Sequence, residues 1–375
     1  MDACDVLIVG GGPAGSSCAW KLRNSGLRVA ILDRQTFPRD KVCGGWITPA
    51  VLDELEIDAT EYARGRVLQP ITGFKTGCIG GPPVETRYGR PVSYGIRRRE
   101  FDDYLLRRSG ACLLPAEPLA SVDRSAAEWI INGRIRTPML VGAGGTFCPV
   151  ARHFGARVNR EVVVAAQEAE FEMDQRQISG CSIQEETPEL YFCPDLKGYG
   201  WCFRKRNVLN VGLGRLDPHR LSGHVAEFLK FLKASGRLSF DVPSSLPGHA
   251  YLLYGAAARS VAGDGVLLIG DAAGVAYARS GEGIRPAIES GLLAAKVIAG
   301  AQRDYSAERL ELYRTLLVER FGNSTSDWPT RIGLRLPGRV ITSLAQHLLA
   351  SRWFTREVVL NAWFLRQNDP VLDST

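Results

Sequence analysis

The chain has 375 residues, of which 45% are hydrophobic and 23% charged, and it contains 40 glycines. This length suits about two domains, and the composition excludes a disordered or disulfide-stapled chain. The formal net charge of +6 is mild and does not indicate a nucleic-acid partner. The many glycines favour a protein that brings its backbone close to a bound ligand.

The N-terminal sequence MDACDVLIVGGG lacks a basic segment and is not typical of a secretory signal. We therefore expect a cytoplasmic protein. The nine cysteines are scattered, without a CxxC pair or metal-ligand spacing, so we expect reduced thiols and no metal site. No apolar run reaches the roughly 18 residues of a spanning helix.

Residues 4–9 form an apolar, β-branched run that predicts a buried parallel strand. Gly10, Gly12 and Gly15 follow with the G-x-G-x-x-G spacing, and Pro13 suits the first turn of a helix. In such a turn the first glycine allows a tight bend, the second lets a pyrophosphate approach, and the third allows close packing of helix on strand. The helix N-terminus would face the phosphates.

A second apolar run, RVAILD, predicts another buried strand that ends at Asp33. An acid about 20 residues beyond the glycines is placed to accept a hydrogen bond from a ribose hydroxyl. The strand, the glycine turn, the helix and the acid together predict a dinucleotide site.

The segment DRQTFPRDKVCGGWITP, from Asp33 to Pro49, is similar to the flavoproteins of the geranylgeranyl reductase family. That family lies within the wider group of FAD reductases and monooxygenases related to hydroxybenzoate hydroxylase. Three later blocks carry the same resemblance. They are RREFD at 98–102, GVLLIGDAAG at 265–274 followed by SGEGIRPAIESGLLAAKVIAG, and YGWCFRK at 199–205 followed by GLG at 212–214.

The resemblance implies that Arg98 reaches the flavin and that Gly270 and Asp271 hold the ribityl chain of FAD. It also implies that a helix opened by Gly281 and Gly283 directs its amide groups at the flavin O2 edge. A solvated charge run and a buried helix cap are the alternatives for Arg98 and Asp271. The expected cofactor-binding residues are Gly10, Gly12, Ala14, Gly15, Asp33, Arg34, Cys43, Gly44, Arg98, Gly270, Asp271, Gly283 and Ile284.

The third block resembles the Y-x-W-x-F-P-K...G-x-G signature of polyprenyl reductases. Alternation places Tyr199, Trp201 and Phe203 on one face of a strand. We expect these rings to contact a long hydrocarbon substrate, and an ordinary sheet core would show the same pattern. The chain departs from the family at Arg204, where the signature has proline, and at residues 142–145, which read GAGG in place of G-A-D-G.

We expect an α/β fold with a discontinuous Rossmann-like FAD-binding domain, an antiparallel-sheet substrate domain and C-terminal helices. The FAD-binding domain would comprise residues 1–60, 95–165 and 250–300. The substrate domain would comprise residues 60–95 and 165–250, with one helix at 225–233. Residues 301–375 would form the C-terminal helical segment, with helices separated by prolines.

Residues 329–366 contain six arginines and one acid, with two tryptophans and two phenylalanines interleaved. This composition suits a helix at a membrane interface, which would attach the protein peripherally. It equally suits an amphipathic helix that packs on the flavin domain with a basic outer face. The sequence leaves both alternatives open.

The predicted activity is the FAD-dependent reduction of carbon-carbon double bonds in an isoprenoid or other long hydrophobic substrate, by hydride from flavin N5. NAD(P)H or a ferredoxin-type protein would supply the electrons. Cys43 and Tyr199 are the candidate catalytic residues, and the alternative for Cys43 is a small residue packed beneath the flavin. Rival functions are a monooxygenase or halogenase on the same scaffold and a flavin-carrying electron-transfer partner. The oligomeric state stays open.

Overall fold

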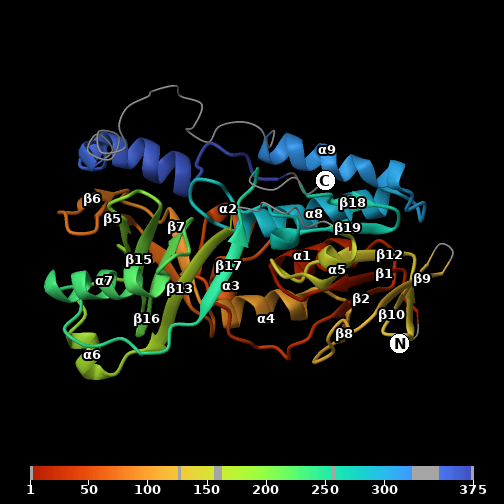
Figure 1. The fold of residues 1–375 in the computed structure, drawn as a ribbon, viewed down its shortest axis with the longest axis horizontal. Coiled ribbons are helices and arrows are strands. Elements are labelled where there is room, and N and C mark those ends of the chain that lie inside the picture. Colours follow the sequence, from red (N-terminus) through yellow and green to blue (C-terminus); the bar gives the residue numbers. More distant parts are fainter. Residues whose placement is uncertain (1–2, 126–127, 156–162, 256–258, 323–345, 373–375) are drawn as a thin grey trace.

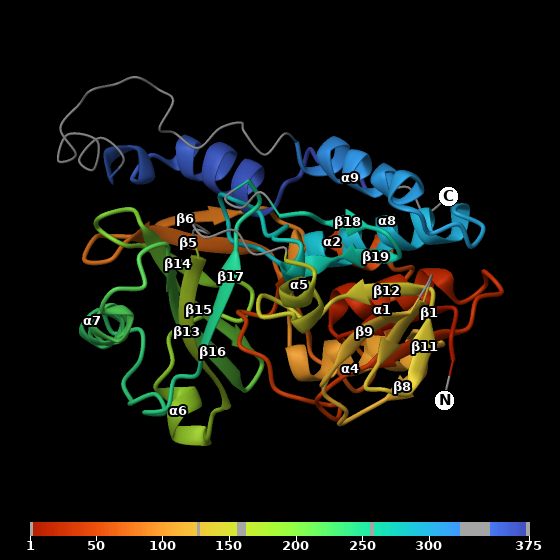
Figure 2. The same cartoon turned by 45° about the vertical axis from the view of Figure 1, so that its right-hand side comes forward.

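The computed structural model describes residues 3–125, 128–155, 163–255, 259–322 and 346–372. A six-stranded and a seven-stranded sheet lie in opposite halves of the molecule, and helices from the last quarter of the chain run along one side of both (Figures 1 and 2). The six-stranded sheet takes its strands from the first 142 residues and from residues 262–268. The chain therefore leaves this sheet to build the other one and then returns to it.

The six-stranded sheet is parallel except at one edge, where its first two strands in spatial order run antiparallel. In spatial order its strands are β18 (Ala262–Gly263), β19 (Val266–Leu268), β12 (Met139–Gly142), β1 (Val6–Val9), β2 (Val29–Leu32) and β8 (Cys112–Leu114). Every residue of β1 and β2 is buried. Continuous Val, Ile and Leu runs form such strands because helices and loops cover both faces of a parallel sheet.

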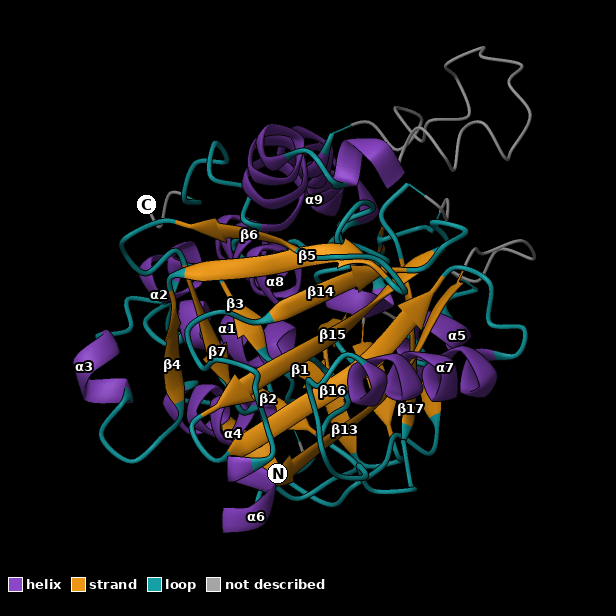
Figure 3. Ribbon diagram, turned by 90° about the vertical axis from the view of Figure 1, so that its left-hand side faces the viewer, coloured by secondary structure: helices purple, strands orange, loops and turns teal. Residues whose placement is uncertain are grey.

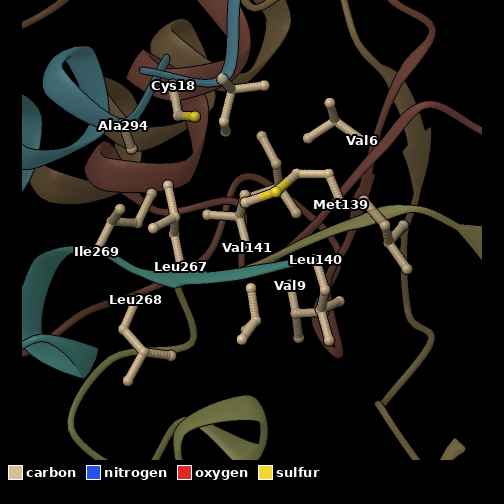
Figure 4. Close-up of a cluster of buried hydrophobic side chains, with 14 of the residues drawn as sticks. Val6, Val9, Cys18, Met139, Leu140, Val141, Leu267, Leu268, Ile269 and Ala294 are labelled. Carbon is tan, nitrogen blue, oxygen red and sulfur yellow. The ribbon is translucent and has the colours of Figure 1, made fainter. Parts of the chain in front are cut away.

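Helix α1 (Pro13–Leu22) packs closely against α8 (Ile284–Gly300) beside this sheet. Gly291 permits that approach, because a Cβ atom there would collide with the carbonyl oxygen of Ala14. Figure 4 shows the apolar core that these elements share, with Cys18 and Ala294 on one side of the strand residues Val141 and Leu267. The core thereby holds the glycine turn before α1 against the start of α8.

The seven-stranded sheet is formed by the middle of the chain and is curved and twisted (Figure 3). In spatial order its strands are β17 (Gly248–Leu252), β13 (Val163–Glu172), β16 (Val208–Arg215), β15 (Gly198–Lys205), β14 (Glu189–Phe192), β5 (Gly73–Cys78) and β6 (Val84–Arg87). Helix α7 (Leu221–Ala234) packs on one face, where Phe228 lies directly over Gly200. The opposite face is turned toward the six-stranded half.

Two three-stranded sheets and several short helices complete the described fold. The first sheet contains β3 (Trp46–Ile47), β7 (Ser93–Ile96) and β4 (Leu68–Ile71), and the second contains β11 (Ile135–Thr137), β10 (Glu128–Ile131) and β9 (Val122–Ser125). The remaining helices are α2 (Pro49–Glu54), α3 (Ala59–Tyr62), α4 (Arg98–Arg108), α5 (Pro149–His153), α6 (Gln175–Ser179), α9 (Ala307–Phe321), a 3₁₀ turn at Gly270–Ala272 and a π-helix at Phe354–Phe364.

The α/β class, the Rossmann-like sheet and the C-terminal helices are confirmed. The larger sheet differs from the expectation in one respect, because β5 and β14 pair in parallel. The helix expected at 225–233 extends over Leu221–Ala234. The expected separators Pro329 and Pro337, and the arginines at 331, 335 and 339, lie outside the described residues. In the described ranges, no helix has the length and apolar character to cross a bilayer.

Candidate active site

A cavity of about 520 Å³ extends from the glycine turn before α1 to the inner face of the seven-stranded sheet. This volume lies within the range of about 300–1,000 Å³ that small-molecule sites occupy. Of the cofactor and substrate residues predicted from the sequence, all except Gly15 line it. Segments from positions 10 to 284 thus meet around one space, although they are far apart in the sequence.

The glycine turn has the geometry that a pyrophosphate requires. Gly10 adopts a φ of +117°, and its Cα faces the carbonyl group of Ala143 so closely that no Cβ would fit. Gly15 packs against the carbonyl of Gly10, which explains why it supports the turn without lining the cavity. A Cβ at Gly12 would meet only the Arg39 side chain, at 3.6 Å, so this backbone is open to the cavity. These residues fit the diphosphate of FAD at the N-terminus of α1.

Asp33 and several cations surround this turn. Asp33 Oδ2 accepts a hydrogen bond of 2.7 Å from Gly11 N–H, and Oδ1 accepts one of 2.8 Å from Gln35 N–H. Arg34 and Arg39 line the same end of the cavity. Arg39 is nearly buried, contacts Asp102 at 3.2 Å, and has a pKa lowered chiefly by burial. The donor set and its positive charge suit an anionic dinucleotide.

Asp271 lies beside two basic groups farther along the cavity. Its carboxylate is 3.6 Å from His249 Nε2, and Lys41 Nζ lies 3.2 Å from the same imidazole ring. Burial would raise the pKa of Asp271, but the hydrogen bond to His249 and the charges of His249, Lys41 and Arg98 outweigh it and the pKa is lowered. Asp271 therefore stays ionised in the cavity wall, where it could accept hydrogen bonds from hydroxyl groups.

Arg98 is the first residue of α4 and is buried between the side chains of Asp102 and Cys43. Two parallel hydrogen bonds of 2.8 and 2.9 Å join its guanidinium to the Asp102 carboxylate. Burial lowers the pKa of Arg98, but Asp102 and Cys43 together raise it above its usual value. The i, i+4 spacing of Arg98 and Asp102 is readable from the RREFD block, whereas the approach of Cys43 has no local signal. The pairing makes Arg98 a fixed positive charge beside Cys43.

Two neighbouring strands of the seven-stranded sheet hold the loop that contains Cys43 and Gly44. The Cys43 N–H donates to Glu168 Oε1, and the Cys43 carbonyl accepts a hydrogen bond of 3.1 Å from Asn210 Nδ2. Gly44 lies against the rings of Trp201 and Phe203, where a Cβ would come within 3.2 Å of Phe203. The loop therefore holds Cys43 at the meeting point of the two sheets.

Aromatic side chains cover the sheet end of the cavity. Tyr199, Trp201 and Phe203 all line it, as their alternation along β15 predicts. Trp201 Nε1 donates to Asn210 Oδ1 at 2.7 Å, and Tyr199 donates from its hydroxyl to the Ser280 carbonyl at 2.5 Å. Leu190 and Ala166 add apolar surface from neighbouring strands. We call the three β15 rings, together with Trp46 and Phe364, the aromatic wall.

The π-helix supplies the last member of this wall. Phe364 is buried, stacks on Trp46 with a centroid distance of 5.6 Å, and meets Tyr199 edge-on at 5.3 Å. Trp353, just before the helix, is 68% exposed. The π-helix thus packs its apolar face onto the seven-stranded half, in one cluster with Phe74 and Trp201, whereas α9 packs on the core of the six-stranded sheet.

Several lining residues were not found by sequence reasoning. Lys41 lies within the quoted block at 33–49, but nothing marked it as a ligand-facing side chain. Glu168 and His249 lie in strands whose sequences carry no motif. For the segment that contains Phe364, the sequence left open whether the helix lies at a membrane interface or packs on the protein. Their positions depend on which strands pair, because register decides which side chains share a face.

Comparisons with known proteins agree with this geometry. A family model described as FAD dependent oxidoreductase matches residues 5–69, which hold the glycine turn, Asp33 and the Cys43 loop. The menaquinone reductase of Mycobacterium tuberculosis (strain H37Rv) is 29% identical over 348 residues, covering 87% of this chain and 82% of that protein. The digeranylgeranylglycerophospholipid reductase of Methanocaldococcus jannaschii is 25% identical over 337 residues, covering 85% and 83%.

Solved structures share the fold at lower identity. A geranylgeranyl bacteriochlorophyll reductase-like protein from Thermoplasma acidophilum has a TM-score of 0.72 and 22% identity, covering 93% of this chain and 88% of that one. The halogenase PltM, in a complex with FAD, has a TM-score of 0.69 and 16% identity, covering 98% and 85%.

The fold, the cavity and the matched family define an FAD-dependent oxidoreductase. The resemblance drawn from its motifs is confirmed as a likeness, because a relative named digeranylgeranylglycerophospholipid reductase matches along most of the chain.

Proposed function

We propose that the protein reduces carbon-carbon double bonds in an isoprenoid or other long hydrophobic substrate. The observation that supports this proposal is the aromatic wall, which continues the cavity beyond the residues that fit FAD. Such a surface suits a hydrocarbon chain, which buries apolar area without needing polar partners. The names of the two reductases reported above are consistent with a lipid or quinone that carries such a chain.

The residues divide along the cavity by role. Gly10, Gly12 and Asp33 would hold the adenosine diphosphate part of FAD, with Ala14 and Arg34 beside them. Arg98, Gly270 and Asp271 would hold the flavin part, together with Gly283 and Ile284 at the start of α8. When bound and reduced, the flavin supplies hydride chemistry. The residues assigned to substrate contact are Tyr199, Trp201 and Phe203.

Cys43 and Tyr199 remain the proposed catalytic residues of the sequence analysis. Cys43 lies beside the buried Arg98 charge, at the edge of the aromatic wall. Tyr199 donates its hydroxyl hydrogen to the Ser280 carbonyl, and burial raises its pKa well above the usual value. Proton transfer from Tyr199 to a substrate would therefore require that hydrogen bond to break. NAD(P)H or a ferredoxin-type protein is the proposed electron donor, and peripheral membrane attachment stays a prediction.

An anaerobic single-turnover experiment tests the proposed function. The flavin of the purified protein is reduced chemically, and a geranylgeranyl lipid or menaquinone is then added. We expect the flavin absorbance to return and mass spectrometry to show two hydrogens added to the isoprenoid chain, not to the quinone ring of menaquinone. Failure of every isoprenoid substrate to reoxidise the flavin would refute the proposal.

The same preparation tests the rival activity. A monooxygenase or halogenase has the support of the fold shared with PltM. Substrate-stimulated oxygen consumption with an oxygenated or halogenated product would favour that alternative. Oxygen uptake that does not change on adding substrate is the expected result.

A further inference from the structure

Glu168 lies on the inner face of the seven-stranded sheet, in one row with the aromatic wall. The strand register aligns Trp201 on β15, Gly212 on β16 and Glu168 on β13. Because Gly212 has no side chain, the indole and the Glu168 side chain meet above it. A Cβ at Gly212 would lie 2.5 Å from Trp201 Cζ2 and 2.6 Å from Glu168 Cβ.

Only one oxygen of the Glu168 carboxyl group has a hydrogen-bond partner within the part of the chain that the structure describes. Oε1 accepts the Cys43 N–H, whereas Oε2 is buried and has no hydrogen-bond partner among the described residues. Glu168 as a whole is 3% exposed and lines the cavity. A buried, unpaired carboxylate oxygen is costly. A protonated carboxyl suits this position, because its carbonyl oxygen accepts from Cys43 and its hydroxyl hydrogen is not held by an acceptor in the described ranges.

The surrounding charges leave this carboxyl poised to exchange a proton. Burial raises the pKa of Glu168, and the Cys43 N–H, the Lys205 ammonium and the Arg98 charge lower it while Glu170 raises it further. The resulting pKa is about 7. Lys205 is itself held by Glu170 and the Ile96 carbonyl, and His249 on the neighbouring strand β17 faces Asp271. A general acid works best when its pKa lies near the working pH.

Other candidate acids in the described cavity are less suited. Tyr199 has its hydroxyl hydrogen bound to Ser280. Glu282 also lines the cavity, has a buried oxygen without a hydrogen-bond partner in the described structure, and has a raised pKa of about 7. Its charged neighbours, however, are Arg285, Glu289 and Arg366, whereas Glu168 is hydrogen-bonded to the Cys43 loop. Glu168 differs from Glu282 in its position, because it lies beside both Trp201 and Cys43.

We propose that Glu168 is the proton donor of the double-bond reduction, a role that rests on the proposed function. Bound reduced flavin would supply the hydride for one alkene carbon, and with it the two electrons of the reduction. The Glu168 O–H bond breaks, and its proton forms a C–H bond at the other alkene carbon. The π electrons of the double bond form that C–H bond. The carboxylate that remains takes its proton back from solvent.

The test is the substitution Glu168→Gln. Glutamine keeps an oxygen that accepts the Cys43 N–H and keeps the shape of the side chain, but it has no acidic proton. We expect flavin content and the visible spectrum to match wild type, and the single-turnover rate of flavin reoxidation by substrate to fall at least about 100-fold. In wild type that rate should decline as pH rises through about 7, because the acid form is lost, and this decline should vanish in E168Q.

An infrared titration gives a readout that does not depend on activity. Subtracting the spectrum of E168Q from that of wild type should isolate a protonated-carboxyl band that disappears as pH rises through about 7. A band absent throughout the neutral range would overturn the proposal. Glu172→Gln is the matched control, because Glu172 lies on the same strand, is exposed and lies outside this cavity. Its rate should equal that of wild type.

The outcomes distinguish a failure of the proposed function from a failure of the role of Glu168. A wild-type protein that reduces no isoprenoid substrate refutes the proposed function and this role with it. An active wild type with an equally active E168Q refutes the role alone and leaves Glu168 as an anchor of the Cys43 loop. The same loss in Glu282→Gln, with E168Q unaffected, would assign the acid to Glu282 and also refute the proposal.

Discussion

Single glycines decide how the aromatic wall is built. Gly212 and Gly214 of β16 lie beneath the indole of Trp201. The indole extends across this strand toward Glu168 and Ala166. The family signature contains these two glycines, and the structure gives Gly212 a steric reason. A side chain at Gly212 would overlap the indole and push it off the sheet, whereas a Cβ at Gly214 would make only ordinary contact with it. A displaced ring could no longer donate from Nε1 to Asn210.

We therefore expect Gly212→Ala to lower the free energy of unfolding by about 1–3 kcal/mol, the usual cost of overpacking a core. The added methyl group would overlap both Trp201 and Glu168. Thermal and urea unfolding followed by tryptophan fluorescence measure the change. Gly223→Ala is the control, because a Cβ there meets nothing within 4 Å and the site lies in helix α7. That variant should gain up to about 1 kcal/mol, and equal behaviour of the two variants would contradict the steric argument.

At the scale of elements, local patterns were predictable and pairings between distant elements were not. The turn from β1 into α1 follows from glycine spacing within six residues, and alternation along β15 placed its three rings correctly. By contrast, the role of Glu168 depends on β13 pairing with β16, which is decided by sheet register. The parallel pairing of β5 with β14 joins segments more than 100 residues apart and has no local signal.

The π-helix illustrates the same limit. Its aromatic residues suggested both a membrane helix and a packed helix, because amphipathic composition is common to both. The structure turns Phe364 inward onto Trp46 and Tyr199 and leaves Trp353 outside. The sequence does not show which aromatic side chains of this segment point inward, because that depends on where the aromatic wall lies.

Phe364→Ala should therefore lower the free energy of unfolding by about 3–5 kcal/mol, as for other buried phenylalanines. It also opens the wall, so the KM for a long-chain substrate should rise. Trp353→Ala, in the same segment but exposed, should change stability by no more than about 0.5 kcal/mol. Thermal unfolding of the two variants, alongside wild type, makes the comparison. A larger loss in W353A than in F364A would mean that the helix is oriented differently in solution.

At the scale of the whole molecule, one buried charge cluster joins the start of the fold to its end. Arg285 on α8 contacts Glu289 at 2.8 Å and Glu54 of α2 at 3.2 Å. Arg320 of α9 contacts Glu289 at 2.5 Å, and both guanidinium groups donate to the Pro370 carbonyl. Four segments that are distant in sequence therefore meet behind the N-terminus of α8.

This cluster fixes the start of α8, where Gly283, Ile284 and Ala287 line the cavity. The cluster therefore supports one wall of the cavity. Arg285 is 1% exposed and both of its carboxylate partners are fully buried. Burial and the nearby Glu289 raise the pKa of Glu54, and Arg285 opposes that rise. Arg285 therefore shares with Arg320 the task of compensating the two buried acids.

We expect Arg285→Met to lower the free energy of unfolding by about 3–5 kcal/mol, because removing one cation of the buried cluster leaves Glu54 and Glu289 to share the charge of Arg320. Adding Glu54→Gln to that variant should recover part of the loss, since glutamine removes one of the two buried acids that then share the Arg320 charge. Arg314→Met is the control, because its pair with Glu311 on α9 is exposed and such pairs contribute at most about 1 kcal/mol. Urea unfolding at neutral pH measures all four proteins. A loss in R285M no larger than that in R314M would show that the cluster does not hold the C-terminal segment against α8.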